Sequence, residues 1–215
     1  MESEGKNASA AALERYHTVR EKLDTGDLVL FSGRSVFSEI IKKLTGAAWS
    51  HVGMVFRLPN RYSINLLWEA SGLLNLPDLD TGRPNKGVQL VPLSDRISVY
   101  HGRIALRLLE AERTPKMIDE LYAFREEMKG RPYEENDIEL LKAAYDGPGG
   151  MNQEDFSSLF CTELIAEAYQ RMGLLGAEKP ANEYTPHDFC SDQQDESEFR
   201  LLQGSLGPEI LIKDV

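Results

Sequence analysis

The sequence predicts an α+β domain, and the order in which its patterns follow one another is the main reason. Short apolar runs typical of strands gather in the first half of the chain, whereas segments with helical spacing dominate the second half. The 215 residues suit a single domain with a substantial core. We therefore expect one domain over 1–215, with a helical extension at 1–23, a core at 24–190 and a tail at 191–215.

The first half is expected to open with a helix at 7–23, where apolar residues recur at helical spacing and Gly26 follows. A short helix is expected at 35–44, and a surface loop at 76–86 is rich in Pro, Asp and Gly. A short segment at 94–100 precedes the last strand of this half. The expected strands are apolar runs bounded by turn residues, at 26–31, 51–57, 62–69, 87–93 and 102–109.

The second half is predominantly helical. A clear helix is predicted at 114–129, and a weaker one at 137–145. A further amphipathic helix at 157–172 is closed by Gly173. After an irregular stretch, a late strand is expected at 209–213. The strands thus precede most of the helices, which is typical of an α+β domain.

Composition and charge disfavour several classes of function. A net charge of −11 argues against a nucleic-acid partner, because binding to a phosphate backbone rests on Lys and Arg. No stretch approaches the roughly 20 apolar residues of a bilayer-spanning helix, and residues 1–22 lack the apolar centre of a secretory signal. Two cysteines do not make a disulfide framework. We expect a cytoplasmic protein with free thiols, no integral membrane segment and no nucleic-acid partner.

Two short strings carry the residues that point to chemistry. His51 opens a buried strand in Ser-His-Val-Gly-Met-Val (50–55), and Cys161 lies near the start of a helix in Phe-Cys-Thr-Glu-Leu (160–164). A thiol at a helix N-terminus feels the positive end of the helix dipole, which favours the thiolate. An imidazole that the fold brings beside this thiol can take its proton and return it. The two strings therefore predict a nucleophile and its base.

Glu69 is the candidate third member. It ends the predicted strand that follows His51, and a hairpin would pair the two strands antiparallel. The end of one strand then lies beside the start of the other, so that the Glu69 carboxylate can orient the imidazole and stabilise its cation. Structural interpretations stay open for all three residues: a cysteine that fills the core, a histidine satisfied at a strand edge, and an exposed acid at a strand end.

These strings and three others in the same order resemble the permuted branch of the NlpC/P60 superfamily, papain-like cysteine hydrolases in which the histidine strand precedes the cysteine helix. The resemblance spans roughly 24–188. It implies a circularly permuted papain-like fold, with a central antiparallel sheet packed against helices that include the cysteine-bearing helix. The matching strings are Gly-Asp-Leu-Val-Leu-Phe (26–31), Ser-His-Val-Gly (50–53), Trp-Glu-Ala (68–70), Gly-Arg-Pro-Tyr (130–133) and Phe-Cys-Thr-Glu-Leu (160–164).

The same resemblance implies amide-bond hydrolysis by a triad. By position, Cys161 matches the family's nucleophile, His51 its base and Glu69 its third member. Tyr133 matches a tyrosine near the oxyanion site, and the alternative that this tyrosine simply packs on the domain stays open. Backbone N–H groups at the helix start, including that of Cys161, would hold the oxyanion.

The predicted function is a thiol hydrolase that cleaves amide or peptide bonds through an acyl-enzyme intermediate on Cys161. Its substrate would be a small peptide-like or lipid-linked amide. Two alternatives stay open: an acyltransferase or lipid amide or thioester hydrolase on the same triad, and a non-catalytic binding module of the same fold. The sequence leaves the substrate and the oligomeric state open.

The remaining histidines and the second cysteine are weaker candidates. His187 is a fallback base. His101 is expected to be structural, His17 solvated and Cys190 idle. No cofactor is expected, and no metal site, because nothing in the sequence has the close Cys or His pair spacing that such sites show.

Overall fold

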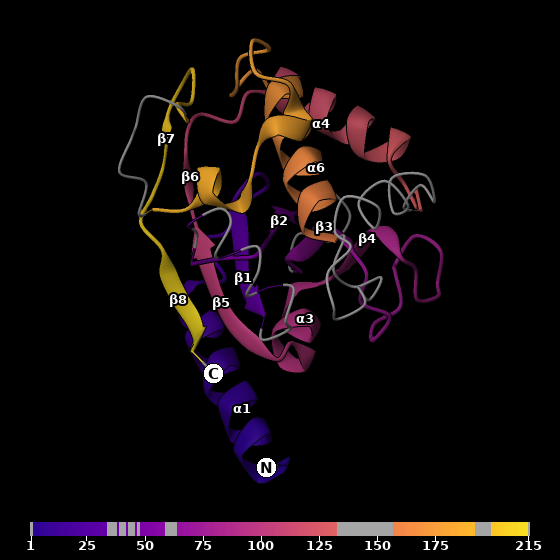
Figure 1. The fold of residues 1–215 in the computed structure, drawn as a ribbon, viewed down its shortest axis with the longest axis vertical. Coiled ribbons are helices and arrows are strands. Elements are labelled where there is room, and N and C mark those ends of the chain that lie inside the picture. Colours follow the sequence, from indigo (N-terminus) through magenta and orange to yellow (C-terminus); the bar gives the residue numbers. More distant parts are fainter. Residues whose placement is uncertain are drawn as a thin grey trace, which may run out of the picture.

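The computed structural model describes residues 2–33, 38, 42, 46, 48–58, 64–132, 157–191 and 199–214. Figure 1 shows α4 and α6 at one end of the molecule and the N-terminal part of α1 at the other. The described elements are α1 (Glu2–Val19), β1 (Leu28–Gly33), β2 (His51–Phe56), β3 (Leu66–Ser71), β4 (Gly87–Pro92), α3 (Leu93–Val99), β5 (Gly102–Arg107), β6 (Leu109–Glu110), α4 (Pro115–Glu127), α6 (Ser157–Arg171), η2 (Ala181–Glu183), η3 (Pro186–Phe189), β7 (Ser205–Leu206) and β8 (Ile210–Asp214).

Within the described residues, a six-stranded antiparallel sheet forms the centre of the fold. Its strands follow the order β4-β3-β2-β1-β5-β8, and every neighbouring pair is antiparallel. All residues of β2 and of β3 are buried, as expected for strands that helices cover on both faces. The predicted α+β class, with a large antiparallel sheet packed against helices, is confirmed.

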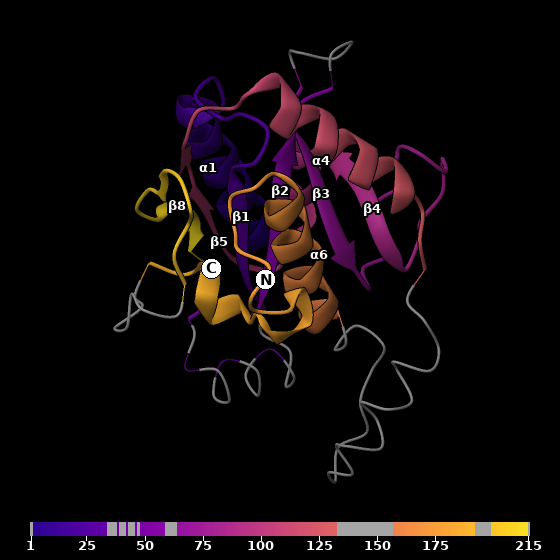
Figure 2. The same ribbon diagram turned by 90° about the horizontal axis from the view of Figure 1, so that it is seen from above.

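Side-chain alternation along the strands divides the core between the two faces of the sheet. Val52, Met54 and Phe56 of β2 belong to the core that also holds buried residues of α4 and α6. Val55 of β2 and Leu67 of β3 point to the opposite face, where they pack with α1 and α3. Figure 2 shows α4 and α6 in front of the sheet and α1 behind it. A residue at the start of β2 therefore lies at the rim between two helical layers.

The expected extension and tail both contribute to this packing. Strand β8 pairs with β5 at the edge of the sheet, and α1 packs against β8 and α3. The Lys213 ammonium of β8 donates to the carbonyl oxygens of Ile97 and Tyr100, at 3.1 and 2.7 Å. The late strand predicted at 209–213 is confirmed as β8, and α1 and β8 are parts of the same packed unit as the sheet.

Several boundaries differ from the prediction. Helix α1 ends at Val19, earlier than expected, and Leu23 is buried although it lies beyond the helix. The segment at 94–100 is mostly the short helix α3, whose buried residues Leu93 and Ile97 are spaced one turn apart. The helix predicted at 137–145, and all but two residues of the one at 35–44, lie outside the described residues.

The two clearest helical predictions are confirmed. Helix α4 begins directly after Thr114, whose hydroxyl oxygen accepts the Met117 N–H at 3.3 Å and so caps the helix. Helix α6 ends at Arg171, and Gly173 then adopts φ 70°, a left-handed conformation that favours glycine. No helix in the described ranges is long and apolar enough to cross a membrane.

Candidate active site

The pairing of β2 with β3 brings His51 and Glu69 together. Met54 pairs with Trp68, and the same register continued by one residue sets Glu69 opposite Gly53 and diagonally from His51, on the same face of the sheet. The atoms His51 Nε2 and Glu69 Oε2 are 2.6 Å apart. A Cβ atom at Gly53 would meet Glu69 Cβ at 3.2 Å and Leu67 Cδ1 at 2.6 Å, so the glycine leaves room for the carboxylate.

Glu69 lies inside β3 and not at its end, which corrects the sequence-based position. The strand runs on to Ser71, so the contact with His51 arises from a diagonal pair and not from a strand end beside a strand start. The side chains of His51 and Glu69 are 11% and 1% exposed. The alternative interpretation of Glu69 as an exposed acid is therefore wrong.

Arg96 completes the hydrogen bonding of the Glu69 carboxylate. Its Nε donates to Glu69 Oε1 at 2.9 Å, on the side of the carboxylate away from His51. The other guanidinium nitrogens donate to Asn75 Oδ1 at 2.6 Å and to Gln89 Oε1 at 3.2 Å. Arg96 is 0% exposed. Sequence reasoning missed this residue, because the segment at 94–100 showed no pattern that placed it against β3.

The charges around Glu69 keep it ionised. Burial by itself would raise the pKa of the Glu69 carboxyl group. The Arg96 guanidinium, together with the hydrogen bond and charge of His51, outweighs that effect and holds the pKa of Glu69 below its usual range. The site therefore contains a fixed negative charge on the far side of the His51 ring.

Cys161 approaches the same end of β2 from the opposite helical layer. It is fully buried, and its sulfur accepts the backbone N–H of Val52 at 3.4 Å. Leu164, Ala168 and Met172 are buried in the same core, as the predicted inward face of the helix requires. The fold thus brings all three predicted triad residues to the start of β2.

Both Cys161 and Glu69 affect the pKa of His51. Burial lowers the pKa of the His51 ring, but the negative charge and hydrogen bonding of Cys161, followed by those of Glu69, raise it to about 10. Because Nε2 is engaged by Glu69, the buried Nδ1 atom is the ring nitrogen available to the sulfur. The raised pKa favours the imidazolium form of His51, backed by the Glu69 carboxylate.

Cys161 lies further into α6 than the predicted role of its N–H at the oxyanion requires. The helix begins at Ser157, so Cys161 is its fifth residue and lies in the second turn. The first four N–H groups of a helix are free of intrahelical partners, whereas the fifth belongs to the helical ladder. The Cys161 N–H is therefore not a free oxyanion donor in this structure. Tyr133, the other residue predicted near the oxyanion, lies outside the described residues.

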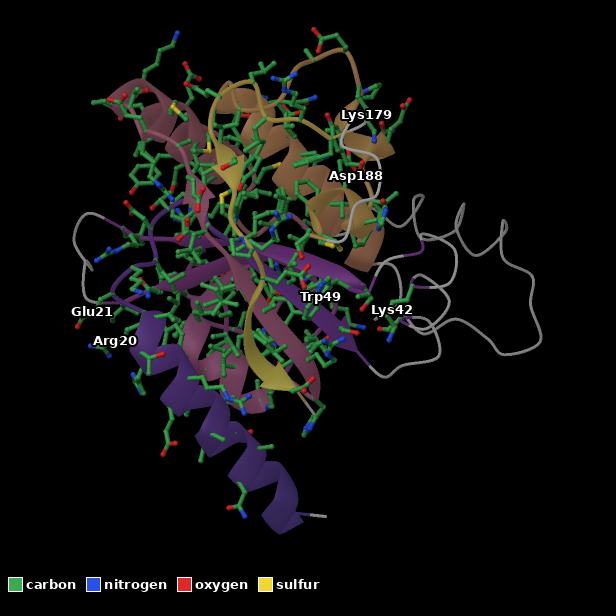
Figure 3. The ribbon with its side chains drawn as sticks, turned by 90° about the vertical axis from the view of Figure 1, so that its left-hand side faces the viewer. Arg20, Glu21, Lys42, Trp49, Lys179 and Asp188 are labelled. Carbon is green, nitrogen blue, oxygen red and sulfur yellow. The ribbon has the colours of Figure 1, made fainter. Side chains whose placement is uncertain are left out.

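Aromatic rings frame the histidine. The Phe31 ring of β1 lies 5.3 Å from the His51 ring and 4.9 Å from that of Tyr100, between centroids. Trp49, labelled in Figure 3, is buried two residues before His51, and the Arg103 guanidinium lies 5.0 Å over its ring. These contacts fix the start of β2 against β1 and β5, and they restrict the directions in which the imidazole can turn.

The weaker candidates lie elsewhere in the fold. His17 and His101 are exposed. His187 belongs to η3, next to Asp188, whose carboxylate lies 3.0 Å from the Lys179 ammonium. Figure 3 labels Lys179 and Asp188. Cys190 is buried, and its thiol donates to a backbone carbonyl oxygen at 3.0 Å. Within the described part of the chain, no group of three or more His, Cys, Asp or Glu side chains is arranged to hold a metal ion.

A cavity of about 340 Å³ lies between α4, α6 and the strands β3 and β4, and Cys161 itself is not among its lining residues. Its wall on α6 includes Phe160 and Leu164, which flank Cys161 along the helix. Its lining combines apolar side chains of the sheet and of α4 with carboxylates and guanidinium groups. The lining residues are Ala70, Val88, Phe124, Glu127, Met128, Arg131, Pro132, Phe160, Glu163, Leu164, Glu167 and Arg171.

Comparisons with known proteins do not assign a family. No protein-family model matches the chain, and no curated protein matches it. One solved structure that is similar is described as metalloprotein YiiX from Escherichia coli O157:H7, DUF1105, at 21% sequence identity and a TM-score of 0.45. The match covers 69% of this chain and 66% of that one, so this chain spans just under two thirds of the YiiX chain. A likeness of this size assigns no function.

Proposed function

We propose that the protein is a thiol hydrolase that cleaves amide or peptide bonds, with Cys161 as nucleophile, His51 as base and Glu69 as the residue that orients it. The observation that best supports the proposal is the 2.6 Å contact between His51 and Glu69 at the same strand end as the Cys161 sulfur. Nucleophile, base and orienting carboxylate are the three parts that covalent catalysis by a thiol requires.

In the proposed reaction the Cys161 thiolate attacks the carbonyl carbon of the amide, forming an S–C bond. The His51 imidazolium gives its proton to the departing amine as the C–N bond breaks, which leaves a thioester on Cys161. The neutral imidazole then takes a proton from water, and the hydroxide attacks the thioester. The products are a carboxylic acid and an amine, and the sulfur is a thiolate again. Glu69 holds the ring and stabilises its cation throughout.

The resemblance to the permuted NlpC/P60 superfamily agrees with this chemistry. The proposed fold is a circularly permuted papain-like domain, because the histidine strand β2 precedes the cysteine helix α6 in the chain. The net charge of −11 favours a neutral or cationic substrate, peptide-like or lipid-linked, over a phosphorylated one. The same steps with a thioester substrate, or with an amine or alcohol in place of water, would give the related thioesterase or acyltransferase.

The proposed reaction also requires that the substrate gain access to the Cys161 sulfur. The Cys161 side chain is 0% exposed, so a substrate carbonyl, or a small alkylating reagent, reaches the sulfur only when a local opening of the site uncovers it. The neighbouring cavity reaches α6 at Phe160 and Leu164 and offers room for the group attached to the carbonyl. Opening of this kind is common in enzymes whose sites exclude water.

Intact-mass spectrometry after incubation with amide and activated-ester libraries, in the presence of a chelator, tests the proposal. We expect an acyl adduct on the wild-type protein that peptide mapping assigns to Cys161. The adduct should be absent from Cys161→Ala and retained in Cys190→Ala, the matched variant at the other buried thiol. An adduct that persists in Cys161→Ala, or activity that the chelator removes, would overturn the proposal; no adduct with any library member would favour a binding module of the same fold.

A further inference from the structure

We infer that Arg96 is a positioning residue of the proposed triad: through Glu69 it fixes both the charge and the orientation of the carboxylate that faces His51. The inference rests on the proposed function and adds a fourth side chain to it. Arg96 touches neither the sulfur nor the imidazole in the described contacts, so its effect on the chemistry is transmitted by the carboxylate.

The hydrogen-bond partners of the Arg96 guanidinium fix it in one orientation. Its three nitrogens each donate to a side-chain oxygen, and Glu69 is the charged partner among them. Gln89 is itself fixed, because its Nε2 donates to the carbonyl oxygens of Ser71 and Leu73 at 3.2 and 3.3 Å. Its Oε1 therefore has to face Arg96. The planar fork of an arginine fits such an arrangement, whereas a lysine ammonium would make fewer of these contacts.

The charges of the site balance only when Arg96 is present. With the sulfur as thiolate and the ring as imidazolium, the row of four buried side chains from Cys161 to Arg96 alternates in sign and sums to zero. Removal of the guanidinium would leave one uncompensated negative charge in a buried site. Buried groups relieve such a charge by binding a proton, either at Glu69 or at the sulfur. Both outcomes reduce the fraction of protein with a reactive thiolate at neutral pH.

The surroundings of Glu69 contain few other groups that could replace this charge. Among the described residues, the titratable and charged groups that face it are His51 from β2, Arg96 from α3 and the phenol of Tyr100 just after α3; from β4 it is faced by the neutral Gln89. The Tyr100 hydroxyl is neutral at physiological pH, because burial raises its pKa. Arg96 is thus the cation on which the ionised carboxylate depends when His51 gives up its proton.

Arg107 provides a matched comparison elsewhere in the molecule. It is also buried, and its guanidinium donates to four backbone carbonyl oxygens at distances of 2.7 to 2.9 Å. These contacts join β5 to the segments around η3 and β7 and are structural. A substitution at Arg107 removes a buried arginine of equal size and charge without touching the triad.

Iodoacetamide labelling of Cys161 between pH 5 and pH 9, followed site by site by mass spectrometry, tests the inference without a known substrate. Arg96→Gln is expected to move the pH of half-maximal labelling upward by about one unit, since a nearby charge shifts titrations by roughly 1–3 units. Arg107→Gln is expected to lower the thermal midpoint and leave this pH unchanged. A folded Arg96→Gln protein with the wild-type labelling profile would overturn the inference.

Arg96→Lys covers the case in which Arg96→Gln does not fold, because it keeps the charge and loses the fork. Its labelling profile should stay close to that of wild type, while kcat for p-nitrophenyl acetate hydrolysis falls about tenfold and KM changes little. Wild-type kcat in Arg96→Lys would contradict the orienting role. Failure of the proposed function gives another result. In that case Cys161 of the wild-type protein would label no faster than Cys190, and no substitution at Arg96 would change its labelling rate.

Discussion

Two buried carboxylates, Glu69 and Asp27, look alike by burial and differ in what they bind. Each is 1% exposed and each pairs with an arginine. Asp27 accepts the backbone N–H groups of Leu109 and Asp24, both at 2.8 Å, in addition to Arg113. In the described contacts, Glu69 is held by side chains alone, those of His51 and Arg96.

The two environments move the carboxyl groups in opposite directions. Burial raises the pKa of Asp27, and its backbone partners and Arg113 do not fully offset that effect. The side chains around Glu69 more than offset burial and lower the pKa of Glu69. Asp27 is a structural anchor that ties the start of β1 to β6. Glu69 contacts a titratable histidine, whereas Asp27 contacts backbone N–H groups and an arginine, which is the physical distinction between a candidate catalytic group and an anchor.

Among the predicted effects, loss of the His51 imidazole should lower the rate of hydrolysis the most. We expect His51→Ala to lower the rate of amide or ester hydrolysis by at least ~100-fold, because proton transfer is lost. The thermal midpoint should show that the protein stays folded. His187→Ala, the matched change at the fallback histidine, should keep wild-type kinetics. Wild-type rates in His51→Ala together with an inactive His187→Ala would show that the site has been assigned to the wrong histidine.

The opposite pKa shifts predict opposite pH dependences of stability. A lowered folded pKa gives stability that is present above the unfolded value of 4.5 for Glu69 and is lost as pH falls through the folded value. A raised folded pKa gives stability that is complete below the unfolded value of 3.8 for Asp27 and is lost as pH rises through the folded value. The wild-type advantage over Glu69→Gln should therefore shrink in acid, and that over Asp27→Asn should grow.

Urea unfolding at pH 7 and pH 4 measures this difference. At pH 7 we expect Glu69→Gln to cost about 3–5 kcal/mol, because Arg96 is left buried without its charge partner. Asp27→Asn should cost about 1–2 kcal/mol, since an amide oxygen still accepts hydrogen bonds. Parallel pH trends for the two variants would mean that Glu69 is a structural anchor like Asp27.

The residues of the site that lie in regular elements could be predicted from the sequence. His51 and Glu69 sit on neighbouring strands, and antiparallel pairing is a local rule that brings such residues together. Cys161 could be placed near a helix start by the pattern of its helix. The prediction placed Glu69 at the end of its strand, whereas the strand continues for two more residues, to Ser71. Glu69 therefore contacts His51 as a diagonal neighbour, and the predicted contact is still made.

The parts that could not be predicted depend on tertiary structure. Arg96 reaches Glu69 from a helix of seven residues, too short for a periodic pattern to reveal. Asp27 and Arg113 are 86 residues apart, and no local signal joins them. Helix α6 also includes Ser157 and so begins earlier than capping by Ser157 or Ser158 suggested. The Cys161 N–H therefore lies within the helix and not at its free end, which removes it from the oxyanion role.

The two free cysteines give the most direct test of the central claim, that His51 activates Cys161. Cys161 and Cys190 are 0% and 3% exposed, so burial alone predicts equal, slow alkylation of both. We predict that iodoacetamide labels Cys161 much faster than Cys190 at pH 6 to 8, and that His51→Ala removes the difference. Equal, slow labelling of the two wild-type cysteines up to pH 8 would contradict it.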